Sequence, residues 1–236
     1  MPANDNLALW ESVEKTDPKA TKGFQGKGGF KGTAISPMWL IMRATAKWGP
    51  MGSRWGIRII AERVQDGAPL IGKDGGVVGR ASVHIVQAEV YYPTDDITSS
   101  QGTVPCFGQT EFCGMRKSGD FYTDEEAPKK SLTDALTKGL SWLGFAADVH
   151  MGLYDDCKYV AQVGKEFEEE ARRDAAQDKL ASRDDIIREM DSACYRGRDA
   201  FAAAWKAMSK EDRELVKDKM PHFEALCKGG KAVPSA

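Results

Sequence analysis

Hydrophobic and polar residues alternate with a period of two in three stretches of the chain, residues 54–64, 81–92 and 103–112. Within the second stretch the even positions from 86 to 92 are apolar, whereas the odd positions are mixed. Segments rich in glycine and aspartate separate the three stretches. The pattern predicts three antiparallel strands whose sheet is covered on one face only.

A helical pattern follows the third strand and supplies the cover for that face. The leucines at positions 132, 136, 140 and 143 form a single apolar stripe, and the pattern ends at Gly144. A second line of polar residues, Lys130, Asp134 and Lys138, recurs every four positions on another side of the same helix. We therefore expect an α+β fold in which a three-stranded antiparallel sheet packs on a long helix.

Two shorter helices are predicted before the strands. Residues 7–14 place apolar side chains at loosely helical spacing, which indicates a short opening helix. Ser36 followed by Pro37 is typical of a helix start, because serine caps the first turn and proline suits its first position. This helix should end at Gly49.

The pattern changes after Tyr159 and predicts a division into domains. A run of mostly charged residues indicates a solvated helical linker, and a second apolar pattern beyond it indicates a small bundle of three or four helices. The predicted division comprises a main domain at 1–160, a charged linker at 161–182, a helical C-terminal module at 183–228 and a flexible tail at 229–236.

Charge is distributed unevenly along the chain, although the net charge is only −2. Residues 18–60 contain eight basic residues and no acidic residue, and five aromatic residues lie among them. Cations interleaved with aromatic rings are typical of a groove for single-stranded nucleic acid, where cations bind phosphates and rings stack on bases. The alternative is a solvated basic face with its tryptophans in the core. The aromatic residues are Phe24, Phe30, Trp39, Trp48 and Trp55.

The glycine-rich stretch 22–35 does not fit either of the common nucleotide-binding motifs. A P-loop needs lysine directly after its last glycine, but Gly28 is followed by Gly29, and Lys31 is followed by glycine instead of serine or threonine. The dinucleotide fingerprint needs an acidic residue about 20 positions further on, and none occurs up to Ile60. We therefore expect no nucleotide-binding pocket in this stretch and no nucleotide cofactor.

Cysteine and histidine usage favours a protein of a reducing cytoplasm without a metal cofactor. The five cysteines form no C-x-x-C pair, and the three histidines are not spaced to form a zinc site with them. No apolar run approaches the length of a membrane span. Three acidic pairs could hold Mg²⁺ in a nuclease, but turns and helix ends also explain them. These pairs are Asp95–Asp96, Glu125–Glu126 and Asp155–Asp156.

Three segments, in this order along the chain, resemble the Rad52-like single-strand annealing proteins, especially those encoded by bacteriophages. The segments are GPMGSRWGIRII, VPCFGQTEF and KKSLTDALTKGLSWLGFAADVHMGLYDDCKYV, and the resemblance covers residues 20–160. It implies a β-β-β-α core that assembles into a homo-oligomeric ring or helical filament. Single-stranded DNA would then lie in a basic groove and be held by its phosphates while a complementary strand pairs.

The resemblance also implies which residues contact DNA. The positions that carry basic residues on the family's long helix correspond here to Lys130, Thr137, Lys138 and Ser141, so hydroxyls replace two cations. Another basic position falls near Phe24, where either Lys22 substitutes or the phenylalanine stacks on a base. The expected DNA-binding residues are Lys22, Lys27, Lys31, Arg43, Lys47, Arg54, Arg58, Lys129, Lys130, Thr137, Lys138 and Ser141.

The function expected from these observations is ATP-independent annealing of single-stranded DNA in recombination and repair, without catalytic residues. The expected location is the bacterial host cytoplasm. A host single-strand-binding protein or a companion exonuclease is the expected partner of the C-terminal module. Two alternatives stay open: a passive single-stranded nucleic-acid-binding protein, and a metal-dependent nuclease.

Overall fold

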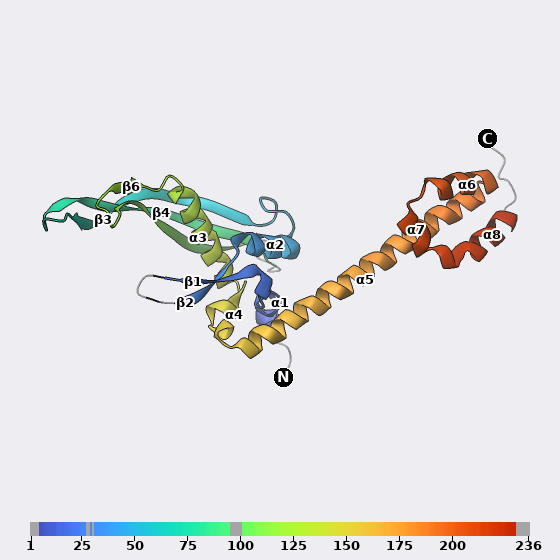
Figure 1. Ribbon diagram of the computed structural model, residues 1–236, viewed down its shortest axis with the longest axis horizontal. Helices are drawn as coiled ribbons and strands as arrows, with labels where there is room; N and C mark the ends of the chain where they lie inside the picture. The colour runs from blue at the N-terminus through green and yellow to red at the C-terminus, as the bar shows by residue number, and fades with distance from the viewer. Residues whose placement is uncertain (1–4, 27–28, 30, 95–100, 230–236) are drawn as a thin grey trace. The chain divides into compact units, whose positions relative to one another are not determined.

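The computed structural model describes residues 5–26, 29, 31–94 and 101–229 of the chain. Its fold is α+β and divides into two compact units, unit 1 at residues 1–164 and unit 2 at residues 165–236. The boundary between the units lies within the long helix α5 (Cys157–Tyr195). Figure 1 shows the sheets and the helices α1 to α4 in the first unit and the helices α6 to α8 in the second.

The N-terminal part of unit 1 contains short helices and one hairpin. Ser36 caps α2 as predicted, since its hydroxyl accepts a hydrogen bond from the backbone of Trp39 at 3.4 Å, and Gly49 ends the helix with φ = 92°. The elements are η1 (Asp5–Leu7), α1 (Ala8–Val13), η2 (Pro18–Ala20), β1 (Thr21–Gln25), β2 (Lys31–Ile35) and α2 (Pro37–Trp48).

The main sheet has four antiparallel strands in the order β3-β4-β5-β6, and β1 and β2 form a separate two-stranded sheet. The prediction of a single three-stranded sheet is therefore wrong. β6 was missed because three residues are too few to show alternation, and the hairpin was missed because glycines hide its period. The strands are β3 (Gly56–Ile71), β4 (Val77–Pro93), β5 (Gln101–Met115) and β6 (Phe121–Thr123).

Helix α3 (Ala127–Trp142) covers one face of the sheet and packs on β4 and β5. Glycines allow the helix to come close, because a Cβ on Gly108 of β5 would overlap the backbone carbonyl of Ser131. A Cβ on Gly139 of α3 would likewise overlap the side chain of Val90. The apolar face of β4 predicted from the even positions is the face that α3 buries.

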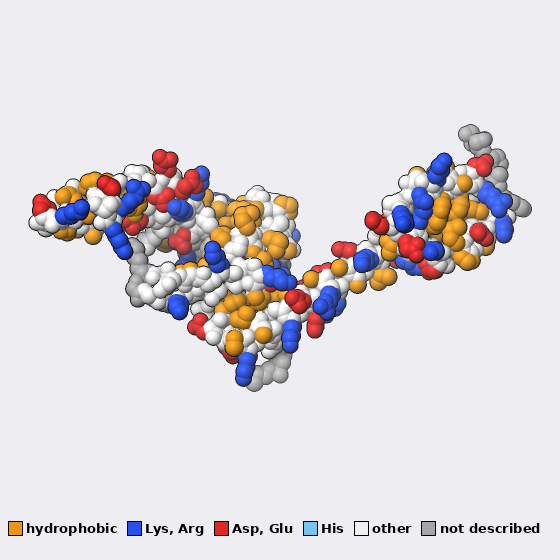
Figure 2. Space-filling model, in the orientation of Figure 1, with side chains coloured by type: hydrophobic (Ala, Val, Ile, Leu, Met, Phe, Trp, Pro, Cys, Tyr) orange, Lys and Arg blue, Asp and Glu red, His pale blue; other side chains and the backbone are white. Residues whose placement is uncertain are grey.

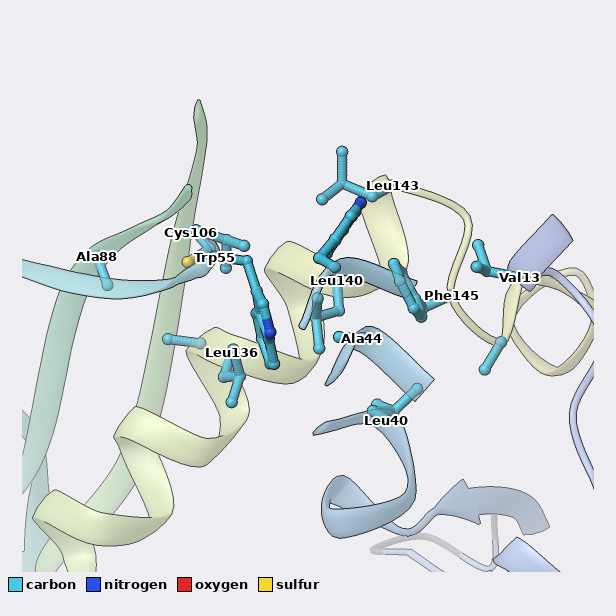
Figure 3. Packing of buried hydrophobic residues seen from close by; sticks show 14 of the residues in the cluster. Val13, Leu40, Ala44, Trp55, Ala88, Cys106, Leu136, Leu140, Leu143 and Phe145 are labelled. Atoms are coloured by element: carbon cyan, nitrogen blue, oxygen red, sulfur yellow. The ribbon is translucent and has the colours of Figure 1, made fainter. Parts of the chain in front are cut away.

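The core of unit 1 lies between α3, the sheet and α2. Trp55 is fully buried, and Figure 3 shows its ring beside Leu136 and Leu140 of α3. Leu40 of α2 and Phe145, which follows α3, belong to the same cluster. The four large side chains Trp55, Leu40, Leu140 and Phe145 expose 1% of their surface or less, so the core holds α2 and α3 against the sheet.

Unit 1 is completed by a polar contact between its two sequence ends. Asp148 in α4 (Ala147–His150) is buried and accepts hydrogen bonds from the backbone and the hydroxyl of Thr16, at 2.8 and 2.6 Å. Tyr159 donates a further hydrogen bond to Asp148, at 3.1 Å, and Tyr154 in η4 (Leu153–Asp155) donates to the carbonyl of Thr16. Because a buried carboxylate needs such donors, these residues hold α4 and the N-terminal segment together.

Unit 2 is a helical bundle around a small apolar core. The C-terminal part of α5 packs with three helices through Met190, Cys194, Val216 and Phe223, all of which are buried. The predicted linker 161–182 forms part of α5, and the predicted tail 229–236 lies almost entirely outside the described residues. The elements after α5 are α6 (Arg198–Ala207), α7 (Lys210–Leu215), η5 (Lys217–Lys219) and α8 (Met220–Gly229).

Candidate nucleic-acid interface

The outward face of α3 carries a line of side chains at four-residue spacing that do not enter the core. Lys130, Asp134, Lys138 and Trp142 follow one another along this line, and all four are exposed. Trp142 exposes 62% of its surface, which is unusual for a tryptophan. The four-residue spacing predicted the line from Lys130 to Lys138, and Trp142, four positions beyond Lys138, continues it although it was not predicted.

The two lysines of the first turn of α3 are paired with neighbouring carboxylates. Lys129 lies 2.8 Å from Glu126, and Lys130 lies 2.6 Å from Asp124. The hydrogen bond from Lys130 lowers the pKa of the Asp124 carboxyl below its ordinary value. Surface pairs of this kind contribute little to stability, so a phosphate oxygen could take the place of the carboxylate.

Two of the predicted DNA-binding residues on α3 carry hydroxyls that bond to the helix itself. Thr137 donates to the carbonyl of Thr133 at 2.9 Å, and Ser141 donates to the carbonyl of Lys138 at 2.9 Å. Such bonds to the preceding turn occupy the hydroxyl proton. In this arrangement the hydroxyl protons of Thr137 and Ser141 are already donated within the helix.

Lys138 is exposed and makes no ion pair with another described residue. It lies close enough to His150 to affect that imidazole: burial lowers the pKa of His150, the charge of Lys138 lowers it further, and the charge of Asp148 opposes the change. A phosphate bound at Lys138 would screen this repulsion.

The β1–β2 hairpin places its two described lysines on opposite faces. In the register of the hairpin Lys22 pairs with Ala34, and Lys31 pairs with Gln25, so Lys31 shares a face with Ile35. Ile35 packs against the core of unit 1, whereas Lys22 and Phe24 point to the other face. Lys27 and Phe30 lie outside the described residues. Lys22 and Lys31 are both exposed, but the hairpin does not gather them into one row.

The basic residues of α2 bind the N-terminal helix. Arg43 donates to the carbonyl of Ser12 at 3.4 Å and lies over the ring of Trp39, and Lys47 donates to the hydroxyl of the same serine at 3.0 Å. These bonds connect α2 to α1, which gives Arg43 and Lys47 a structural role beside the predicted DNA-binding one.

The two other predicted arginines lie in different surroundings. Arg54 is exposed in the turn before β3. Arg58 on β3 bonds to Glu89 at 2.7 Å and to Gln101 at 3.0 Å, and its guanidinium stacks on Tyr91. Because β4 places Glu89 on the face opposite α3, Arg58 does not join the lysines of α3 on one surface.

The tryptophans of the basic segment belong mostly to the core. Trp48 and Trp55 expose 6% and 0% of their surface, and Trp39 packs against the same cluster. For these three residues the alternative of core tryptophans is therefore correct. Phe24 exposes 45% of its surface. Stacking of an aromatic residue of this segment on a base therefore stays a prediction for Phe24.

A second group of cations lines a pocket beside the turns that follow β3 and β5. The sequence did not indicate this pocket. The turn after β3 and the turn after β5 enclose about 720 Å³, and Lys73, Arg116 and Lys117 line this space together with Phe121. Asp74 and Asp120 line it as well. Nothing in the spacing of these residues could have predicted the pocket, because only the sheet brings the two turns together.

The described residues of the predicted acidic pairs bond to separate partners. Glu126 pairs with Lys129, and Asp156 accepts a hydrogen bond from the backbone of Lys158 at 2.8 Å. Asp95 and Asp96 lie outside the described residues. Within the described ranges, no three histidine, cysteine, aspartate or glutamate residues are grouped closely enough to hold a metal ion. No helix in the described part of the chain has the length and apolar character needed to cross a membrane.

Charged side chains on unit 1 are scattered in the view of Figure 2, with acidic residues between the basic ones over the sheet. A continuous basic groove is therefore not visible on this face. No protein-family model matches the chain, and no curated protein matches it.

Proposed function

We propose that this chain is a single-strand annealing protein that works without ATP and binds single-stranded DNA along the outward face of α3. The observation that carries the proposal is the pair Lys138 and Trp142, a cation and an exposed ring one helical turn apart. A cation for the backbone beside a ring for a base is the combination that single-stranded binding sites use. Lys130 extends the same line toward the start of the helix.

The order of elements in unit 1 supports the same proposal. Three long strands followed by α3 form the β-β-β-α order that the resemblance to the Rad52-like family implies, with β6 as a short addition. Annealing needs no chemical step from the protein, because each stacked base-pair step supplies about 1.4 kcal/mol. The protein need only hold one strand extended and exposed to its complement.

Homo-oligomer formation is part of the proposal, and the edge strand β3 supports it. Helix α3 covers β4 and β5 and leaves the apolar side chains of β3 exposed: Ile59, Ile60 and Val64 each expose more than half of their surface. Long apolar edge strands ordinarily pair with another chain unless they are protected. We assign this edge to contact with a second copy of the chain.

The opposite edge of the sheet is protected, which strengthens the contrast with β3. On β5, Pro105 has no backbone N–H to offer, and Asp134 of α3 accepts the backbone N–H of Gln109 at 3.2 Å. β3 carries Pro69 toward its end, but no described strand pairs with its outer edge around Ile59 to Val64. Replacing Val64 with lysine should therefore shift the purified protein toward monomers in light scattering coupled to gel filtration.

An annealing assay without ATP tests the function: two complementary labelled oligonucleotides are mixed, and the quenching of fluorescence on pairing gives the rate. We expect the wild-type protein to accelerate pairing. K138A should weaken the binding of single-stranded DNA about tenfold. It should also reduce the slope of log K, the binding constant, against log salt concentration by about one. K228A makes the same charge change on an exposed residue of unit 2 and should leave both quantities unchanged.

Three outcomes separate the rival functions. Pairing at the spontaneous rate would contradict annealing, and slower pairing on coated strands would indicate a passive binder. Magnesium-dependent cleavage that is lost in D155A would indicate the nuclease. Deleting residues 183–236 should leave annealing intact if this region binds a partner protein, a role that stays a prediction.

A further inference from the structure

Two cysteines that are far apart in the sequence touch within unit 2. Cys194 lies near the end of α5, Cys227 lies in α8, and their sulfur atoms are 2.7 Å apart although 33 positions separate the residues. A disulfide bond measures about 2.05 Å between sulfurs, so small side-chain rotations suffice to form one. The spacing of the five cysteines in the sequence gave no sign of this pair.

The surroundings of the pair distinguish its two thiols. Cys194 is fully buried and donates to the carbonyl of Phe223 at 3.4 Å, whereas Cys227 is only partly buried. Burial, and after it the hydrogen bond with Cys227, raises the pKa of Cys194 to about 12. Asp191 and His222 lie nearby, with the carboxyl Oδ1 and the imidazole Nε2 2.9 Å apart.

The pair does not complete a metal site among the described residues. A structural zinc ion takes four ligands, and no third histidine, cysteine, aspartate or glutamate joins the two sulfurs in a suitable group. Two thiols in contact without a metal are suited to one reaction in particular, their oxidation to a disulfide.

We propose that Cys194 and Cys227 form an oxidisable dithiol, a modification site at which a hydroperoxide converts the two thiols to an intramolecular disulfide. The thiolate of Cys227 attacks one oxygen of the peroxide, the O–O bond breaks, and Cys227 becomes a sulfenic acid as an alcohol or water leaves. The sulfur of Cys194 then attacks the sulfur of Cys227. The S–O bond breaks, and the departing hydroxide takes the Cys194 proton to form water.

The two thiols therefore have different roles. Cys227 reacts first because the oxidant can reach it, and Cys194 resolves the sulfenic acid because it is buried in contact with Cys227. In total the thiols lose two protons and two electrons, and hydrogen peroxide is reduced to two molecules of water. Because the thiolate of Cys227 is the form that attacks the peroxide, disulfide formation should become faster as the pH rises.

The disulfide would join α8 to the end of α5 and close a loop that contains α6, α7 and η5. A crosslink of this length reduces the entropy of the unfolded chain and stabilises the folded bundle. The proposal concerns unit 2 alone and does not depend on the nucleic-acid function proposed for unit 1.

The inference is tested by treating the full-length protein with a small excess of hydrogen peroxide and then titrating its free thiols. We expect two of the five cysteines to be lost and a non-reduced peptide pair that links Cys194 to Cys227, both reversed by dithiothreitol. Hydrogen exchange of α8 should slow by at least about tenfold in the oxidised protein. C157S, at an exposed cysteine, should behave as the wild type.

Two variants separate the roles of the thiols. C194S should leave a Cys227 sulfenic acid that dimedone traps, whereas C227S should leave Cys194 unreactive. C227S also covers the case in which C194S fails to fold, since residue 227 is only partly buried. A linked peptide absent from oxidised wild-type protein, or unchanged exchange of α8 in the linked protein, would overturn the proposal.

Discussion

The two units of this protein are held together in different ways. In unit 1 the decisive contacts join residues far apart in the sequence, such as Thr16 and Asp148, which are 132 positions apart. In unit 2 the core joins the end of α5 to helices that follow it closely, as Cys194 and Cys227 show at 33 positions. Unit 2 thus depends on local helical pattern, whereas unit 1 depends on the assembly of its sheet.

Both units carry surface ion pairs, such as Arg58–Glu89 in unit 1. In unit 2, Arg183 pairs with Asp218 at 2.7 Å and Lys217 pairs with Glu214 at 3.2 Å. In unit 1, Lys138 has no such pair among the described residues and stands beside the exposed Trp142. The proposed nucleic-acid contact on unit 1 depends on this lysine and this ring, and not on a general difference in charge between the units.

The largest expected loss of stability comes from disturbing the close contact of α3 with the sheet. In G108A the new methyl group would overlap backbone atoms of Ser131, which cannot move without displacing the helix. We expect a loss of more than about 4 kcal/mol of stability in unit 1, measured as faster hydrogen exchange in β4, β5 and α3. G23A adds a methyl group in open space and is the matched control. Equal effects of the two changes would show that the contact is not tight.

The next effect should be confined to unit 2. Phe223 is completely buried and packs against Phe201, so F223A should cost about 3 to 5 kcal/mol through lost burial and the cavity left behind. Hydrogen exchange resolved by peptide, followed in α6 and α8 as denaturant is added, measures this loss in a chain that keeps all its tryptophans. Y195A removes a ring that is 61% exposed and should change little. Simultaneous loss of exchange protection in unit 1 would mean that the two units unfold together.

A smaller effect is expected from the cap of α7. The hydroxyl of Ser209 accepts the backbone N–H of Asp212 at 3.0 Å, so S209A should cost unit 2 about 1 kcal/mol. S209T keeps the acceptor and should restore most of the stability. Denaturation midpoints of the three proteins measure the difference, and equal midpoints would show that the cap contributes nothing.

The smallest effect concerns pH and unit 1. Because burial and Lys138 lower the pKa of His150 in the folded protein, the unfolded chain binds this proton more readily than the folded one. The stabilising contribution is complete above the ordinary value of 6.5 and is lost as the pH falls through the folded pKa. Thermal unfolding of unit 1 across this range should show the decline, and H150Q should remove it. K138Q should raise the His150 pKa in an NMR titration.

Much of the secondary structure could be read from the sequence, but the sheets could not. Leu132 to Leu143 predicted α3 and the face it buries, and Ser36 with Gly49 predicted both ends of α2. The strands extend beyond their predicted ends, because turns such as Gly72–Gly76 lie further out than the alternation reaches. The hairpin β1–β2 and the short β6 lacked a readable period.

For the candidate site, sequence identified residue types but not their partners. It indicated that cations gather in residues 18–60, yet the structure pairs Arg58 with Glu89 and directs Arg43 and Lys47 to Ser12. It did not indicate that Cys194 meets Cys227, or that Trp142 is exposed beside Lys138. Sequence alone determined the helical periods and the uneven charge, because these depend on neighbours along the chain. Only tertiary structure decided which charges are neutralised and which side chains meet, because those contacts depend on how distant strands and helices pack.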